Sequence, residues 1–234
     1  MSGSAQVRYY RDRGEAMKKF VRRFRHEIST PLSGAALHLE VAARRLQKTD
    51  GFDRNAVLEN LRVSQQALEN ASQMLDWIGE FSRGDEEVPG EVALVPLVNG
   101  AAEPFREDLL RRGLALELPP DADGPRWFGS GRELSEVVSE LTANAFQHAA
   151  APGVVRWSVE DGGGAPVLAC ESPGTLPAGD PEHLFGAAKG AESPGRGFGL
   201  LRARRLAQSN GADLTLAQSG AAVRATLRFH PETA

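Results

Sequence analysis

The sequence predicts an antiparallel helical hairpin followed by an α/β sandwich, in which helices cover one face of a mixed sheet. Two observations lead to this fold class. Apolar residues recur at steps of three and four over residues 15–48 and again over residues 53–83, as they do in amphipathic helices. From residue 95 onward, helical patterns alternate with short apolar strands and turn residues, an order that is typical of a sheet covered by helices.

Length and composition are those of an ordinary folded protein with room for one large domain or two small ones. The chain has 234 residues, of which 41% are hydrophobic and 25% are charged. Its apolar runs are too short to cross a membrane, and its N-terminus lacks the apolar segment of a secretory signal. The single cysteine, Cys170, excludes a disulfide scaffold and a cysteine-rich metal site. We therefore expect a cytoplasmic protein that has no membrane partner.

The first 48 residues are strongly basic. They contain eleven Lys or Arg and four Asp or Glu, which gives +7; because the whole chain carries −4, the remainder carries −11. A basic stretch can bind nucleic acid, but no aromatic or glycine pattern of a nucleic-acid-binding module accompanies this one. We expect no nucleic-acid partner, and a helical surface that suits an acidic protein.

The first predicted helix, Glu15–Lys48, and the second, Asp53–Arg83, are joined by the turn-forming segment KTDGFD. A short link between two such helices favours an antiparallel hairpin. The hairpin has more apolar residues than one seam can bury, so we predict a homodimer with a four-helix bundle across a two-fold axis. Residues 1–84 are assigned to this dimerisation domain. The predicted seam of the first helix comprises Met17, Val21, Phe24, Ile28, Leu32, Ala35, Leu39, Ala42 and Leu46.

A polar linker that contains glycine and proline, Arg83–Glu91, separates the hairpin from a second domain, residues 91–234. The segment Asp161-Gly-Gly-Gly is expected to form a hairpin turn between two of its strands. The predicted helices are Val95–Arg112, Gly131–Ala149 and Leu200–Asn210. The predicted strands are Leu114–Leu118, Val154–Val159, Val167–Cys170, Leu214–Ala217 and Val223–Phe229.

The segment RHEISTPLSG, Arg25–Gly34, places a histidine beside a carboxylate on the first helix. His26 lies off the apolar seam, and a neutral imidazole is a nucleophile near pH 7 that can attack phosphorus. The neighbouring Glu27 can hold or take the proton of the other ring nitrogen. Pro31 removes the hydrogen bond to the Glu27 carbonyl, so we expect the helix to bend there. An exposed histidine on a proline-kinked helix, without a function, is the alternative.

The segment ELTANAFQHA, Glu140–Ala149, combines a polar and an apolar face on one predicted helix. Glu140 and Asn144 are four residues apart and so share a face. The amide oxygen of Asn144 suits a hard cation such as Mg²⁺, which prefers oxygen ligands and keeps water and substrate phosphates around it. A solvated polar face is the alternative.

The segment GRGFGL contains Gly195, Gly197 and Gly199 and leads into the last predicted helix. Glycines let backbone amides approach a phosphate, and a helix N-terminus adds positive potential. Such a string can equally be a simple turn.

Taken in order, these segments resemble the motifs of sensor histidine kinases over about residues 15–229. HEISTPL resembles the H-box, ELTANA the N-box, GRGFGL the G2 box, and Phe185 the aromatic residue of the F-box. The resemblance implies a Bergerat-type ATP-binding domain that uses ATP and Mg²⁺, with Asn144 as the metal ligand and Glu140 and the glycines beside the nucleotide. It also implies that His26 accepts a phosphoryl group, that Glu27 acts as acid or base, and that Thr30 positions water for dephosphorylation of a partner.

One motif departs from the family pattern. The adenine-binding G1 box, Asp-x-Gly-x-Gly after a strand, corresponds here to ESPGTLP. Glu171 takes the place of the aspartate, and Pro173 and Thr175 replace the two glycines. Glutamate can still accept a hydrogen bond from the adenine amino group, so Glu171 joins the predicted nucleotide-binding residues, but proline supplies no amide and stiffens the loop.

The resemblance implies a two-component histidine kinase that phosphorylates His26 from ATP and passes the group to an aspartate of a response regulator receiver domain. Because only about fourteen residues precede the first predicted helix, we expect the signal to come from a separate sensor protein. The alternative is an adaptor that shuttles phosphate between response regulators without ATP, which the altered G1 box favours. A third possibility is an ATPase or protein kinase that acts through Glu140, with His26 incidental.

Overall fold

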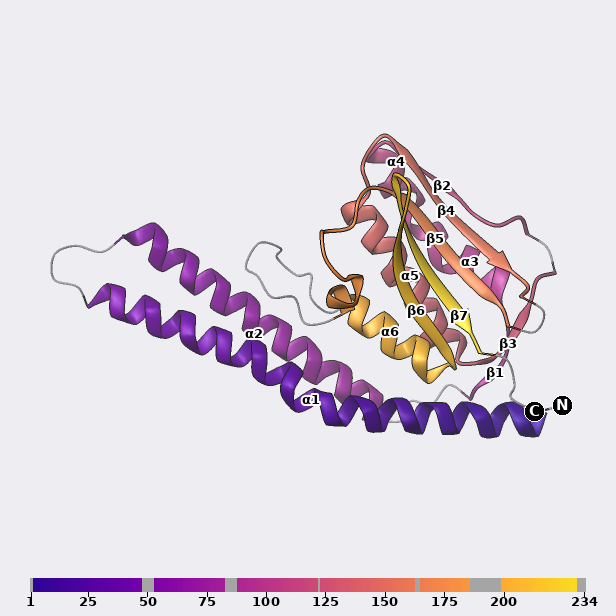
Figure 1. Ribbon diagram of the computed structural model, residues 1–234, viewed down its shortest axis with the longest axis horizontal. Helices are drawn as coiled ribbons and strands as arrows, with labels where there is room; N and C mark the ends of the chain where they lie inside the picture. Colours follow the sequence, from indigo (N-terminus) through magenta and orange to yellow (C-terminus); the bar gives the residue numbers. More distant parts are fainter. Residues whose placement is uncertain are drawn as a thin grey trace. The chain divides into compact units, whose positions relative to one another are not determined.

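The computed structural model describes residues 2–47, 53–82, 88–121, 123–162, 165–185 and 199–230. They fall into two compact units (Figure 1). One unit contains described residues from the ranges 1–19, 86–185 and 199–234, and the other contains described residues from the range 20–85. The first helix, α1 (Ser2–Leu46), contributes its N-terminal part to the first unit and the rest to the second.

The helical unit is a hairpin of α1 and α2 (Arg54–Ser82), as the sequence predicted. Helix α1 is not interrupted at Pro31, so the bend expected there stays a prediction. Asp53 caps α2, because its carboxylate accepts the backbone N–H groups of Asn55 and Ala56 at 3.0 and 3.1 Å. Helix α1 begins well before the predicted start at Glu15.

Small side chains form the contact between the two helices of the hairpin. The Ser64 hydroxyl donates to the Ala35 carbonyl at 3.1 Å, and His38 Nδ1 lies 2.9 Å from Asn60 Oδ1. These cross-connections fix an antiparallel register. The buried residues of this contact are Ala35, Ala42, Val57, Ser64 and Ala71.

The leucines of the hairpin lie elsewhere. The apolar pattern of the sequence therefore divides into two stripes, a buried one of small residues and an exposed one of leucines. The exposed stripe, with 42–55% of each side chain accessible, consists of Leu32, Leu39 and Leu46 of α1 and Leu61, Leu68 and Leu75 of α2.

The second unit is built on a five-stranded sheet in the order β2-β4-β5-β7-β6. Strands β2 and β4 are parallel, and the other neighbours are antiparallel. A separate antiparallel pair joins β1 and β3. The strands are β1 (Gly90–Ala93), β2 (Leu114–Glu117), β3 (Arg126–Gly129), β4 (Gly153–Glu160), β5 (Val167–Pro173), β6 (Ala212–Ser219) and β7 (Ala222–Phe229).

Helices cover one face of this sheet (Figure 1). One of them is α5, whose Thr142 accepts a hydrogen bond from the buried Trp157 Nε1 at 3.2 Å. Cys170 lies opposite Trp157 in the sheet and belongs to the same core. The helices are α3 (Leu94–Ala102), α4 (Arg106–Arg111), α5 (Gly131–His148) and α6 (Gly199–Ser209), with short 3-10 helices η1 (Glu103–Phe105) and η2 (Pro181–Phe185).

The N-terminal part of α1 packs against this sheet unit through a buried aromatic side chain. Tyr9 is 4% exposed and meets Phe128 edge to face, with 6.4 Å between ring centroids. The guanidinium of Arg8 lies 4.0 Å from the ring centroid of Trp127. Burial, together with the nearby Glu133 carboxylate, raises the pKa of Tyr9 to about 12.

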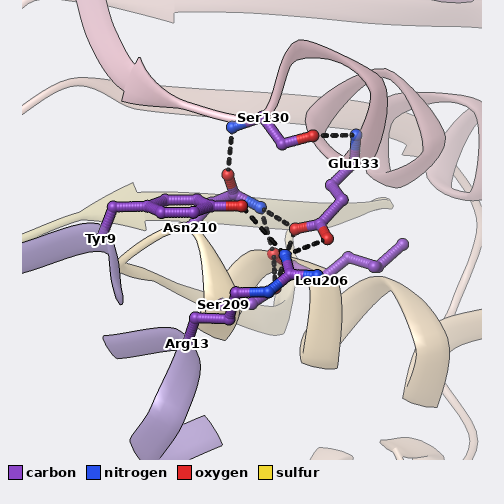
Figure 2. A network of polar contacts seen from close by, with 7 residues as sticks. All are labelled: Tyr9, Arg13, Ser130, Glu133, Leu206, Ser209 and Asn210. Carbon is purple, nitrogen blue, oxygen red and sulfur yellow. Dashed lines mark hydrogen bonds and ion pairs between the residues drawn. The ribbon is translucent and has the colours of Figure 1, made fainter. Parts of the chain in front are cut away.

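A buried polar network joins α1 to the start of α5 and the end of α6 (Figure 2). Arg13 Nη1 donates to Glu133 Oε1 at 2.6 Å. The other carboxylate oxygen of Glu133 accepts from Ser209 Oγ at 3.1 Å and from Asn210 Nδ2 at 2.8 Å. Asn210 Oδ1 in turn accepts the backbone N–H of Ser130 at 2.8 Å, and Ser130 caps α5. The network therefore supplies the partners that a buried carboxylate requires.

Candidate functional site

Three acidic or amide side chains form a stripe on α5. Glu136, Glu140 and Asn144 follow each other at intervals of four residues, so they project from one face of the helix. The opposite, apolar face packs into the core and fixes the rotation of the helix. Its fully buried residues include Leu134, Val137 and Val138. Burial of one face thus decides that the polar stripe points away from the core.

The first turn of α6 lies directly against this stripe. A methyl group placed at Gly199 would lie 2.6 Å from Glu140 Oε2 and 3.8 Å from Asn144 Nδ2. Only glycine allows this approach without displacement of the Glu140 carboxylate. The structure therefore brings together three of the predicted nucleotide-binding residues, Glu140, Asn144 and Gly199, at the N-terminus of a helix.

The orientation of Asn144 suits a cation. Its Nδ2 donates to the Glu140 carbonyl oxygen at 2.8 Å, so the amide oxygen is the atom left for another contact. In the part of the chain that the structure describes, no group of three or more His, Cys, Asp or Glu side chains could hold a metal ion. A hard cation that takes one protein oxygen and completes its shell with phosphate and water fits such a donor set.

Arg202 is a residue of this site that the sequence analysis did not identify. It follows Gly199 by one helical turn, and its Nη2 lies 2.6 Å from Glu136 Oε2 while Nη1 lies 3.6 Å from Glu140 Oε1. Burial raises the pKa of Glu140; the charge of Arg202 opposes this shift and that of Glu136 adds to it. The signal in the sequence was an arginine three residues after the last glycine of GRGFGL.

Glu171 lies on the other face of the sheet. Side chains alternate along β5, so Glu171 points opposite to Cys170, which belongs to the core beneath the helices. Its Oε1 accepts from Arg224 Nη1 at 3.3 Å. Across the sheet Glu171 is also a neighbour of Arg156, which pairs with Glu117 at 2.6 Å. This placement gives Glu171 a role in a row of surface charges and does not favour the nucleotide contact predicted from the sequence.

Strand β5 also extends further than predicted. It continues through Pro173, so Ser172 shares the face of Cys170 and Glu171 does not. Had the strand been predicted to continue past Cys170, the alternation of side chains would have placed Glu171 on the face opposite to Cys170. Burial raises the pKa of the Cys170 thiol to about 12, which keeps this cysteine in its thiol form.

The other predicted site residues are less fully described. His26 and Glu27 lie within helix α1, but their side chains are outside the described part of the chain. Thr30 is exposed on the same helix. Gly195 and Gly197 lie outside the described residues. Phe185 is buried at the end of η2, with the guanidinium of Arg204 4.4 Å from its ring centroid.

Comparison with known proteins shows what the sheet unit is similar to. Residues 129–232 match the family described as "Histidine kinase-, DNA gyrase B-, and HSP90-like ATPase". The sensor protein CopS of Pseudomonas syringae pv. tomato is 27% identical over 166 residues, which cover 68% of this chain and 31% of CopS. The chain thus spans about a third of the length of this relative.

Solved structures of histidine kinases share the fold. The complex of histidine kinase ThkA with response regulator protein TrrA gives a TM-score of 0.57 at 17% identity, over 100% of this chain and 68% of that chain. Histidine kinase AdeS of Acinetobacter baumannii gives 0.53 at 17% identity, over 89% of this chain and 98% of that chain. The matched class is an ATPase-type domain that follows a pair of helices. These matches confirm that the chain resembles the transmitter of a sensor histidine kinase.

Among the residues that the structure describes, no helix is both long enough and apolar enough to cross a membrane.

Proposed function

We propose that the chain is the transmitter of a two-component system: it transfers the γ-phosphoryl group of ATP to His26 and then to an aspartate of a response regulator. The observation that carries this proposal is the convergence of Glu140, Asn144 and Gly199 at the start of α6. The ATPase family match over residues 129–232 supports ATP as the ligand there. The HEISTPL segment on α1 supports histidine as the acceptor.

In the proposed nucleotide site, the helix N-terminus at Gly199 and the glycines Gly195 and Gly197 offer backbone amides to the phosphates. Asn144 contributes its amide oxygen to Mg²⁺. Bound Mg²⁺ would neutralise charge on the phosphates. Glu140 lies beside Gly199 and Asn144, and the apolar packing of α5 keeps its carboxylate in place.

In the proposed transfer, one nitrogen of the neutral His26 ring attacks the γ-phosphorus. A P–N bond forms, the P–O bond to ADP breaks, and Glu27 takes the proton of the other ring nitrogen. Thr30, exposed one helical turn further along α1, positions the water that hydrolyses the phosphoryl group of the partner and releases inorganic phosphate. The phosphoryl group is then available to a receiver domain. The solved complex of ThkA with response regulator protein TrrA supports a partner of this kind.

We also propose that the chain acts as a homodimer. The exposed leucine stripe on α1 and α2 has the spacing of a helix-packing seam, and a second hairpin would cover it in a four-helix bundle. In this arrangement the dimerisation and phosphoacceptor hairpin lies within residues 1–84, of which the first 19 group with the sheet unit, and residues 91–234 form the ATP-binding domain.

Labelled nucleotide tests the proposal. Purified protein incubated with γ-labelled ATP and Mg²⁺ is expected to gain acid-labile label, and His26→Ala and Asn144→Ala are each expected to abolish it. The matched control is His183→Ala, which removes an exposed histidine from η2 and should retain the label. Label that survives His26→Ala, or ATP hydrolysis unchanged by that substitution, would contradict transfer through His26.

The placement of Glu171 favours a second candidate, an adaptor that carries phosphate between response regulators without ATP. Glu171 is paired with Arg224 and not aimed at an adenine, and Pro173 and Thr175 stand where the motif has flexible glycines. The site would then bind the adenine of a nucleotide weakly. The adaptor would show no nucleotide binding and no label from ATP, but it would accept a phosphoryl group on His26 from a phosphorylated receiver domain. The same set of purified variants distinguishes the two functions.

A further inference from the structure

We infer that Arg202 is a positioning residue of the nucleotide site: its guanidinium holds the Glu136 and Glu140 carboxylates beside Gly199 and supplies the positive charge that lets a polyphosphate approach them. This inference rests on the proposed ATP-binding function. It concerns residues of α5 and α6 whose contacts are described.

The geometry places Arg202 between the acidic stripe and the helix N-terminus. It lies three residues after Gly199, so its side chain leaves α6 on the side where Gly199 lies. The guanidinium contacts Glu136 at 2.6 Å and Glu140 at 3.6 Å. Among the described residues no hydrogen-bond partner meets its buried Nε, and its two terminal nitrogens face the two carboxylates. A planar guanidinium can serve two carboxylates at once, which a single amine does less well.

Charge explains why such a residue is needed. Two carboxylates next to a helix N-terminus would repel the phosphates of a nucleotide, and all three side chains are about one third exposed, so solvent only partly screens them. The guanidinium reduces the net charge of the cluster from two negative charges to one. The phosphates are then repelled less strongly, and the backbone amides at Gly199 can donate hydrogen bonds to them.

Arg202 is the cation whose contacts with both Glu136 and Glu140 are described. Helix α3, which packs on α5, has no ionisable side chain. The charged groups on the remaining neighbours of α5 have partners of their own: Glu103 of η1 with Arg106, Glu171 of β5 with Arg224, and Arg204 of α6 with Glu182. Arg205 of α6 donates to Gln208. Arg202 thus supplies a counter-charge to both Glu136 and Glu140.

Equilibrium binding of Mg²⁺-ADP to the full chain, measured by calorimetry, tests this role. Arg202→Ala is expected to weaken binding about tenfold, the effect of losing one favourable charged contact. Arg202→Lys keeps the charge and should restore most of the affinity. The matched control is Arg204→Ala, which removes an arginine from the same helix together with its own ion pair to Glu182 and should leave binding unchanged.

Removal of a negative charge separates positioning from direct contact with the nucleotide. Glu136→Gln keeps a hydrogen-bond acceptor for Arg202 but removes one charge, so alone it should leave affinity unchanged or raise it. Combined with Arg202→Ala, it should recover a large part of the lost affinity. If Glu136→Gln recovers none of it, the guanidinium contacts the phosphates directly and the positioning role is wrong.

Three further outcomes test the role of Arg202. Unchanged affinity in Arg202→Ala would overturn the inference and leave the proposed function intact. Failure of the wild-type chain to bind nucleotide would overturn the proposed function, and the inference with it. If Arg202→Ala does not fold, as judged by circular dichroism, Arg202→Lys and Glu136→Gln still decide, because weaker binding by Glu136→Gln would contradict the charge argument.

Discussion

At the scale of single residues, the sequence predicts which side chains share a helix face better than it predicts the face of a sheet to which a side chain points. The spacing of Glu140 and Asn144 on a helix fixes a common face, and the structure confirms that they lie together. The position of Glu171 depends on where its strand ends. Because β5 continues to Pro173, a residue expected in a loop becomes part of the sheet and points away from the helices. A residue type and a motif position are therefore insufficient when a one-residue change of register reverses the face.

The surface position of Glu171 leads to a prediction about its removal. Glu171→Gln loses an ion pair in which both side chains are about one third exposed, so the free energy of unfolding should fall by less than about 1 kcal/mol. Binding of Mg²⁺-ADP should be unchanged. Urea denaturation and calorimetry measure the two quantities, with Asn144→Ala as the variant that should lose binding. A folded Glu171→Gln protein without nucleotide affinity would restore the assignment made from the sequence.

At the scale of elements, the long regular segments were predicted and the short or tertiary-dependent ones were not. Helices α2, α5 and α6 and strands β2, β4, β6 and β7 lie close to their predicted positions, because their apolar periods are strong. Strands β1 and β3 have four residues each and too little pattern to identify. The first turns of α1 were missed because their contacts, such as Arg13 with Glu133, lie 120 residues away in the sequence.

The network at the start of α1 makes a prediction about stability. In Arg13→Ala the carboxylate of Glu133, which is 6% exposed, loses a cation at 2.6 Å, and two neutral donors remain among its described contacts. We expect the free energy of unfolding to fall by about 2–3 kcal/mol, since a buried charge is left without its ion partner. Chemical denaturation monitored by tryptophan fluorescence measures this, because Trp127 and Trp157 lie in the same unit.

A control on the same helix makes that test specific. Arg44→Ala breaks an exposed ion pair with Glu40 and should change stability by less than about 0.5 kcal/mol. Adding Glu133→Gln to Arg13→Ala should recover part of the loss, because it removes the unpaired charge and keeps the acceptor. If Arg13→Ala is as stable as Arg44→Ala, the ion pair between Arg13 and Glu133 does not stabilise the unit.

At the scale of the whole molecule, the stripe of small residues and the stripe of leucines on the hairpin differ in burial, and the leucines form an apolar surface that a single chain leaves exposed. Small residues form the buried contact between α1 and α2, and the leucines at seven-residue spacing stay about half exposed. The sequence pattern alone merged the two stripes into a single seam. Leucines at this spacing and exposure are typical of a surface that another helical hairpin covers.

A substitution in this stripe tests the assembly. Leu68→Glu places a charge at the middle of the α2 leucines and should convert a dimer into a monomer, because burial of an unpaired carboxylate opposes association. Light scattering coupled to size exclusion should give about twice the chain mass of 25.1 kDa for the wild type and that mass for the variant. Leu110→Glu is the matched control, since Leu110 is an exposed leucine of α4 outside the hairpin. A monomeric wild type, or a Leu68→Glu protein that remains dimeric, would show that the leucine stripe is not the dimer interface, and transfer to His26 would then have to take place without this bundle.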